Sequence, residues 1–143
     1  MTEIPVAVVA GVGSGTGEAL VRRFVEGGYR VAMIARKEER LARISDDVPD
    51  AVSYPCDMAD IEGLRATLNR IKEEMGQPKV AIHNGAKAVR EHYTKIDPLE
   101  FESTFRVNTT ALLVLAQELC PDMVEMGECA LLVTGNTGAW RGK

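Results

Sequence analysis

The chain has 143 residues, of which 45% are hydrophobic and 27% charged, a composition that suits one globular domain with one core. Its net charge of −4 disfavours nucleic acid and anionic membranes as partners, and no apolar run reaches the length of a membrane span. Three cysteines without a Cys-x-x-Cys pair, two scattered histidines and no basic leader segment predict a cytoplasmic protein with reduced thiols and no metal site.

Short apolar runs alternate with amphipathic segments along the whole chain. The apolar runs predict strands at residues 4–10, 29–35, 51–54, 80–83 and 130–134. The amphipathic segments predict helices at residues 18–26, 37–48, 61–75 and about 98–126. We expect Asp97 and Pro98 to begin the last helix and Pro121 to interrupt or kink it. This alternation predicts an α/β fold with a doubly wound parallel sheet, in which ligands bind at the carboxyl ends of the strands.

A glycine-rich turn, Gly-Val-Gly-Ser-Gly-Thr-Gly at residues 11–17, joins the first predicted strand to the first predicted helix. Glycines let a backbone approach a pyrophosphate closely, and a helix N-terminus offers free N–H groups to phosphates. The G-x-G-x-x-G pattern fails here, because Thr16 or Glu18 stands at the third glycine position. No Gly-Lys-Ser/Thr follows either. The pattern that fits is G-x-x-x-G-x-G, and a flexible loop is the alternative interpretation.

That spacing resembles the turn of the short-chain dehydrogenase/reductase family, Thr-Gly-x-x-x-Gly-x-Gly, with Ala10 in place of the threonine. Further matches follow in order along the chain. The resemblance implies a Rossmann-type sheet that is incomplete at the C-terminus, with residues 1–143 as a single dinucleotide-binding domain that stops before the family's Tyr-x-x-x-Lys helix. The cofactor-binding residues that it implies are Gly11, Gly13, Ser14, Gly15, Thr16, Gly17, Arg36, Asp57, Met58, Asn84, Gly85 and Ala86.

Arg36 follows the second predicted strand, where a ribose 2′-hydroxyl favours an acidic residue and a 2′-phosphate favours an arginine. The sequence therefore predicts NADP(H) as the cofactor, with NAD(H) less expected. Alternatively, Arg36, Lys37 and Arg40 form a solvated helix face. Asp57 resembles the family aspartate beside the adenine ring, and it could equally be a turn or capping aspartate.

Residues 83–86, His-Asn-Gly-Ala, resemble the family's Asn-Asn-Ala-Gly segment, which packs against the cofactor and braces the sheet. Asn84 is retained, whereas the other three residues depart from the pattern. We interpret His83 as a core histidine with a hydrogen-bond partner, not as a ligand or a base. Asn108 is a poor interior helix residue unless its side chain has a partner. The resemblance places Asn108 in the catalytic group, and a helix kink filled by its side chain is the alternative.

The resemblance also implies a tyrosine proton donor with a lysine four residues later, and a serine after the fifth strand. Tyr29, Tyr54 and Tyr93 all lack a lysine at that spacing. The serine position falls on Asn136, which can donate to an oxyanion, with the hydroxyl of Thr137 adjacent. A plain turn fits these residues equally well. The predicted catalytic residues are therefore Asn108, Asn136 and Thr137.

The leading hypothesis is an NADP(H)-dependent oxidoreductase that transfers hydride between nicotinamide and a small-molecule carbonyl or secondary alcohol. Because this chain lacks the tyrosine and lysine, we expect it to be inactive alone, whether it is a fragment or a natural short form. A non-catalytic dinucleotide-binding or interaction module is the alternative. A methyltransferase on the same sheet is a third, which Arg36 disfavours. By resemblance we also expect a homo-oligomer formed through the helix at residues 101–126, whose segment 112–116 is apolar nearly all round.

Overall fold

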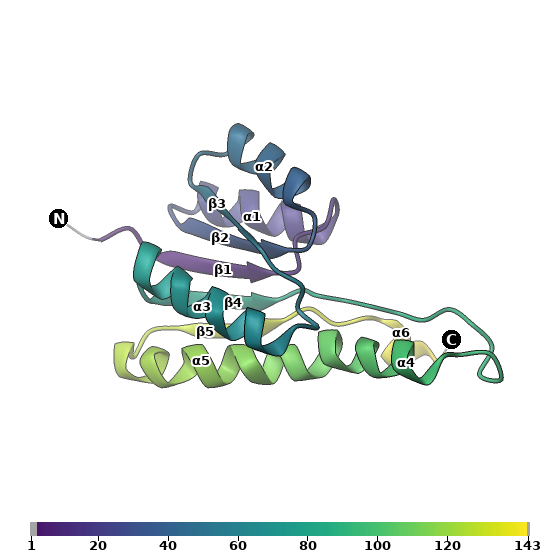
Figure 1. Ribbon diagram of the computed structural model, residues 1–143. Coiled ribbons are helices and arrows are strands. Elements are labelled where there is room, and N and C mark those ends of the chain that lie inside the picture. Colours follow the sequence, from purple (N-terminus) through teal and green to yellow (C-terminus); the bar gives the residue numbers. More distant parts are fainter. Residues whose placement is uncertain (1–2, 143) are drawn as a thin grey trace.

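The computed structural model describes residues 3–142 and contains one sheet of five parallel strands (Figure 1). The spatial order of the strands is β3-β2-β1-β4-β5. The chain therefore runs outward from β1 to β3 and then crosses back to add β4 and β5 on the other side. This order confirms the doubly wound parallel sheet of the Rossmann type. The strands are β1 (Val6–Ala10), β2 (Arg30–Ala35), β3 (Ala51–Pro55), β4 (Pro78–His83) and β5 (Ala130–Val133).

Helices cover both faces of the sheet (Figure 1). The two faces belong to two separate core clusters, one with α1 and α2 and the other with α3 and α5. The long helix predicted at residues 98–126 is divided into α4, a short π-helical turn η1, and α5. The helices are α1 (Thr16–Glu26), α2 (Glu38–Asp47), α3 (Ile61–Met75), α4 (Pro98–Phe105), η1 (Arg106–Thr110), α5 (Ala111–Met126) and α6 (Gly138–Arg141).

The central strand β1 shows why its sequence is apolar without alternation. All five of its residues are buried. Val8 and Ala10 pack into the cluster with α3 and α5, whereas Ala7 and Val9 pack into the cluster with α1 and α2. A strand covered on both faces must be apolar at every position, which is the pattern that predicted a parallel sheet.

Most predicted boundaries agree with the structure to within two residues, but the interruption predicted at Pro121 was wrong. Helix α5 continues through Pro121 to Met126. Proline removes one backbone donor, and here the buried residues Leu119 and Met123 on either side hold the helix against the core. The irregularity lies earlier, at η1, where the Ala111 N–H bonds to the Arg106 carbonyl five residues back.

The carboxyl ends of the parallel strands lie at one edge of the sheet, the edge from which the connection to α4 extends (Figure 1). The start of α4 was predicted correctly, because the Asp97 carboxylate accepts the Leu99 N–H at 2.9 Å and Pro98 occupies the first turn. Within residues 3–142, no helix is both long enough and apolar enough to cross a membrane.

Candidate cofactor-binding site

A cavity of about 440 Å³ opens at the carboxyl edge of the sheet. Its walls come from the connections that follow β1, β2, β3 and β4, together with α4 and η1. The strand order places the end of β1 between the ends of β2 and β4. The lining residues are Gly11, Val12, Gly13, Thr16, Gly17, Ala35, Arg36, Lys37, Arg40, Cys56, Asp57, Met58, Ala59, Asn84, Gly85, Ala86, Lys87, Ser103 and Val107.

The cavity gathers nearly all the residues that the sequence proposed for cofactor binding. The exceptions are Ser14 and Gly15, which do not line it, although Gly15 caps the N-terminus of α1. The lining residues that sequence reasoning did not propose for cofactor binding are Val12, Ala35, Lys37, Arg40, Cys56, Ala59, Lys87, Ser103 and Val107. The positions of Ser103 and Val107 depend on how α4 and η1 pack, so no local motif marks them.

Two glycines of the turn are required by close packing rather than by flexibility. Gly11 has φ +105°, and a Cβ there would collide with the backbone of Asn84 and Gly85. A Cβ on Gly17 would lie 2.8 Å from the Cα of Val12 and 3.1 Å from the Asn84 side chain. At Gly11 and Gly17 the glycine-rich turn therefore packs closely against the connection that follows β4.

Asn84 links the ends of three strands. Its Nδ2 donates to the Gly11 carbonyl at 2.8 Å, and its Oδ1 accepts from the Thr134 hydroxyl at 2.8 Å. Its backbone N–H donates to the Ala10 carbonyl at 2.7 Å. The bracing role implied by the resemblance therefore has a physical basis here. Thr134 was missed from the sequence, since nothing marks it apart from its place at the end of a strand.

Gly85 stands where the family segment has alanine, and the side chain of Met58 lies in the space that the alanine methyl group would need. A Cβ on Gly85 would lie 2.7 Å from the Met58 sulfur and 3.6 Å from a methyl group of Val107. Met58 therefore occupies the space that a larger residue would need. The contact joins the connection after β3 to the connection after β4 and to η1, and it closes one wall of the cavity.

Basic side chains gather where the connection after β2 lines the cavity. Arg36 and Lys37 are exposed and Arg40 is half-buried. Within residues 3–142, none of the three forms an ion pair. Their exposure is compatible with the solvated helix face considered as the alternative, and their charges also line the cavity without a carboxylate partner. An anionic group of a ligand would find compensating charge there.

The connection after β3 contributes a turn aspartate and a half-buried thiol. The Asp57 carboxylate accepts the Ala59 N–H at 2.9 Å, which is the turn role considered for it, while the residue also lines the cavity. Asp60, not Asp57, caps α3 by accepting the Gly63 N–H. Burial raises the pKa of the Cys56 thiol, so the group remains protonated at neutral pH.

The π-helical turn η1 depends on a buried histidine. In an α-helix the Ala111 N–H would bond to the Val107 carbonyl, but in η1 it bonds to Arg106. The Val107 carbonyl lies 3.0 Å from His83 Nε2, and because a carbonyl only accepts, that nitrogen must donate. His83 is 2% exposed, which confirms its interpretation as a core histidine with a hydrogen-bond partner.

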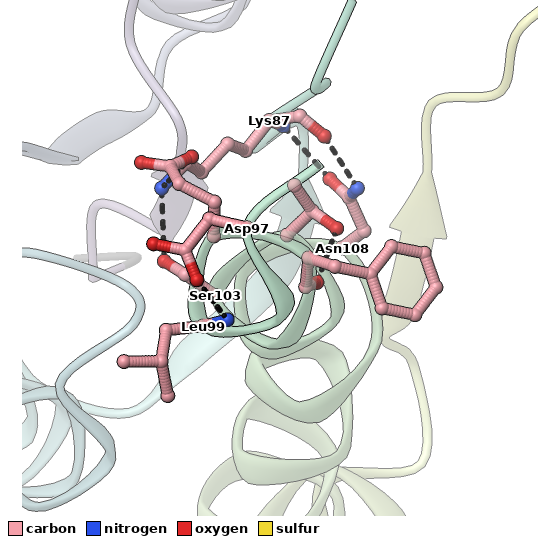
Figure 2. Close-up of polar contacts among 8 residues, drawn as sticks. Lys87, Asp97, Leu99, Ser103 and Asn108 are labelled. Carbon is pink, nitrogen blue, oxygen red and sulfur yellow. Dashed lines mark hydrogen bonds and ion pairs between the residues drawn. The ribbon is translucent and has the colours of Figure 1, made fainter. Parts of the chain in front are cut away.

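Asn108 lies in η1 and holds the connection after β4 (Figure 2). Its Oδ1 accepts the Lys87 N–H at 2.9 Å, and its Nδ2 donates to the Lys87 carbonyl at 2.7 Å. The side chain thus has the partner that an interior asparagine requires. Asn108 does not line the cavity itself, but the residue that it holds does.

Asn136 and Thr137 lie beyond β5, are exposed, and do not line the cavity. The Asn136 Oδ1 accepts the Gly138 N–H at 2.7 Å, immediately before the short helix α6. The turn interpretation therefore describes their local structure, and their catalytic role stays a prediction. Among residues 3–142 no three metal-binding side chains of the His, Cys, Asp and Glu types come together.

Solved structures share this fold. The chain superposes with a TM-score of 0.85 on a metagenomic short-chain oxidoreductase in complex with NADP, at 24% identity, covering 92% of this chain and 62% of that one. It superposes with a TM-score of 0.88 on 3-ketoacyl-(acyl-carrier-protein) reductase from Brucella melitensis complexed with NADH, at 24% identity, covering 99% and 61%.

Curated relatives with similar sequences are named as dehydrogenases. A 3alpha-hydroxysteroid dehydrogenase of Mediterraneibacter gnavus is 28% identical over 95% of this chain and 57% of its own length. The NADP-dependent 3-hydroxy acid dehydrogenase YdfG of Shigella flexneri is 25% identical over 94% of this chain and 56% of its own length. The chain thus spans little more than half the length of these relatives. The family described as short chain dehydrogenase matches residues 5–138, and the chain therefore belongs to the short-chain dehydrogenase family.

Proposed function

We propose that residues 1–143 form the dinucleotide-binding domain of an NADP(H)-dependent oxidoreductase. The reaction is hydride transfer between the nicotinamide and a carbonyl or secondary alcohol of a small molecule. The observation that carries this proposal is that the packed glycine-rich turn and the unpaired basic side chains after β2 line the same cavity. A dinucleotide laid along the strand ends would place its pyrophosphate at the glycine-rich turn, beside the N-terminus of α1.

The preference for NADP(H) rests on Arg36 and Arg40. Both line the cavity and neither has an acidic partner among the described residues, so a ribose 2′-phosphate would supply the missing negative charge. A relative is named as NADP-dependent, which supports this choice. Solved structures of the same fold contain either NADP or NADH, so the proposed preference rests on the basic residues of this chain.

The chain's own residues bind and orient the cofactor, which supplies the hydride when bound. Asn84 and His83 brace the cavity, and Asn108 positions the connection after β4. None of the three tyrosines has a lysine four residues later, so we propose that proton transfer needs residues that this sequence does not contain. Asn108, Asn136 and Thr137 would assist from η1 and from the end of β5.

The test is a titration of the chain with NADPH and NADH, followed through energy transfer from Trp140 and through the fluorescence of the bound nucleotide. We expect saturable binding with preference for NADPH. Arg36→Ala and Arg40→Ala should each weaken NADPH binding about tenfold and leave NADH binding nearly unchanged, since each removes a charged hydrogen bond to the 2′-phosphate. Arg23→Ala, an exposed arginine of α1 outside the cavity, is the matched control. Failure to bind either nucleotide would refute the proposal.

A non-catalytic nucleotide-binding module is the second candidate, favoured by the lack of a tyrosine with lysine spacing. It shares the cavity and predicts the same binding. The two differ in one result: a longer chain that contains the downstream sequence should oxidise NADPH with a carbonyl substrate if the protein is a reductase. Lasting absence of turnover, with intact binding, favours the module. Family membership gives the methyltransferase hypothesis no support.

We also propose that the chain associates with a second copy through α4 and α5. Phe101, Phe105 and Leu113 on these helices are 60%, 58% and 56% exposed, which is unusual for large apolar side chains on one helical unit. Light scattering after size exclusion would give a dimer or larger species. A Phe105→Lys variant should shift it toward the monomer.

A further inference from the structure

We propose that Lys87 is a phosphate-binding residue for the adenosine half of the dinucleotide, and that Glu100 competes with the phosphate for its ammonium group. This inference rests on the proposed nucleotide-binding function. It adds a specific contact that neither the glycine-rich turn nor the basic residues after β2 supply.

Lys87 and Ser103 both line the cavity, and Figure 2 shows the hydrogen bond between their side chains. The Lys87 Nζ donates to the Ser103 hydroxyl at 2.9 Å and lies 3.5 Å from a carboxylate oxygen of Glu100. The Lys87 side chain is only 29% exposed. Among the described residues that line the cavity, it is the one lysine or arginine outside the group after β2. The structure thus places a positive charge at the end of the cavity that belongs to β4.

The backbone of Lys87 is fixed, so only its side chain needs to move. Asn108 bonds to both the N–H and the carbonyl of Lys87. Gly85, two residues earlier, packs directly against Gly11 of the glycine-rich turn. Two residues span at most about 7 Å of chain, which is close to the reach of an extended lysine side chain. The Lys87 side chain and the glycine-rich turn line the same cavity, so a change of rotamer would move the ammonium group toward a phosphate held at that turn.

The present partners of Lys87 are weak enough to be displaced. Glu100 is 55% exposed and its carboxylate lies 3.5 Å away, a geometry typical of surface ion pairs with little net stabilisation. The Ser103 hydroxyl is neutral. A phosphate offers a charged acceptor inside a partly enclosed cavity, where a charge-assisted hydrogen bond is stronger. Exchange of Glu100 for a phosphate oxygen should therefore favour the bound state.

The experiment compares three ligands, adenosine, AMP and NADPH, in wild-type chain and in Lys87→Met. We expect the variant to bind AMP and NADPH about tenfold more weakly than wild type does, because these two ligands carry a 5′-phosphate. Adenosine carries none, so the variant should bind it as wild type does. Lys95→Met removes the same charge from the same connection at an exposed position outside the cavity, and it should bind all three ligands like wild type.

The competition is tested in the opposite direction with Glu100→Gln, which should raise NADPH affinity a few-fold. Glu102→Gln is the control, since Glu102 pairs with Arg106 and not with Lys87. Unchanged AMP and NADPH affinities in Lys87→Met overturn the inference. An equal loss for adenosine also overturns it, because the contact would then lie at the base or the ribose and not at the phosphate. If the wild-type chain binds no NADPH, the proposed function fails as well. If the wild-type chain binds NADPH and Lys87→Met binds it equally tightly, this inference fails alone. Because methionine keeps the aliphatic stem and the backbone bonds of residue 87, circular dichroism should show an unchanged fold.

Discussion

The side-chain amide of Asn108 bonds to both backbone groups of Lys87, as a neighbouring strand would, at 2.9 and 2.7 Å. The pair joins η1 to the connection after β4, across a separation of 21 residues. Two walls of the candidate site are therefore held together by one side chain. That arrangement explains how an exposed connection can keep a fixed backbone next to the cavity.

Replacing Asn108 with leucine should destabilise the chain by about 1–2 kcal/mol, because two hydrogen bonds are lost at a partly solvated position. Urea unfolding measures the loss of stability, and hydrogen exchange should show faster exchange at the Lys87 amide. Asn108→Asp keeps the acceptor and loses the donor, so its effect should be intermediate.

Thr109→Ala is the matched control for Asn108, because it changes the same π-helical turn at an exposed side chain with no hydrogen bond among the described residues. We expect a stability change below about 0.5 kcal/mol. If Asn108→Leu changes stability no more than this control and the Lys87 amide stays protected, the two bonds do not hold the connection.

Asn84 and Thr134 should be energetically coupled, since the Thr134 hydroxyl donates to the Asn84 Oδ1 at 2.8 Å. Asn84→Ala should cost about 2 kcal/mol, because it also leaves the Gly11 carbonyl without its donor. Thr134→Val removes only the hydroxyl and should cost less. In a double-mutant cycle of unfolding free energies, we expect a coupling of about 0.5–1.5 kcal/mol. Strict additivity would mean that the bond contributes nothing.

The sequence predicted those parts of the site that follow directly from strand ends. Gly11, Arg36 and Asn84 each come after a buried strand, and parallel strands bring such positions to one edge. Periodicity alone was enough to place the strands and most helices. The order of the strands then brought these residues together in one cavity.

The remaining parts depend on tertiary contacts that leave no local signal. The turn η1 exists where His83, from another element, takes up the Val107 carbonyl, and no helical pattern shows this. Lys87 and Ser103 line the cavity, and the backbone of Lys87 is held there by Asn108 of that turn. Pro121 gave a misleading signal for the same reason: burial of neighbouring residues outweighs the loss of one backbone donor.

Gly17→Ala should destabilise the chain by about 1–3 kcal/mol, because the added methyl group meets the backbone of the glycine-rich turn itself. Gly13→Ala is the control within the same turn, since no atom lies within 4 Å of a Cβ there. Thermal unfolding of both variants measures the difference. Equal melting temperatures would show that the turn relaxes at little cost, and the close packing of Gly17 would then not explain its presence.

Tyr54 should make the chain less stable at high pH. Burial raises the pKa of Tyr54 from 10.0 to about 12, and its hydrogen bond to Glu74 acts in the same direction. In the unfolded chain the phenol ionises at its ordinary value, so above about pH 10 the unfolded state has lost a proton that the folded state still holds. Stability should therefore fall as pH rises through this window.

Urea unfolding of wild type and Tyr54→Phe between pH 8 and about 11.5 tests this, and the phenylalanine variant should show a shallower decline. Tyr93→Phe, which removes a phenol that is 80% exposed, is the matched control and should keep the wild-type slope. Identical slopes for wild type and Tyr54→Phe would show that the buried phenol does not couple folding to pH.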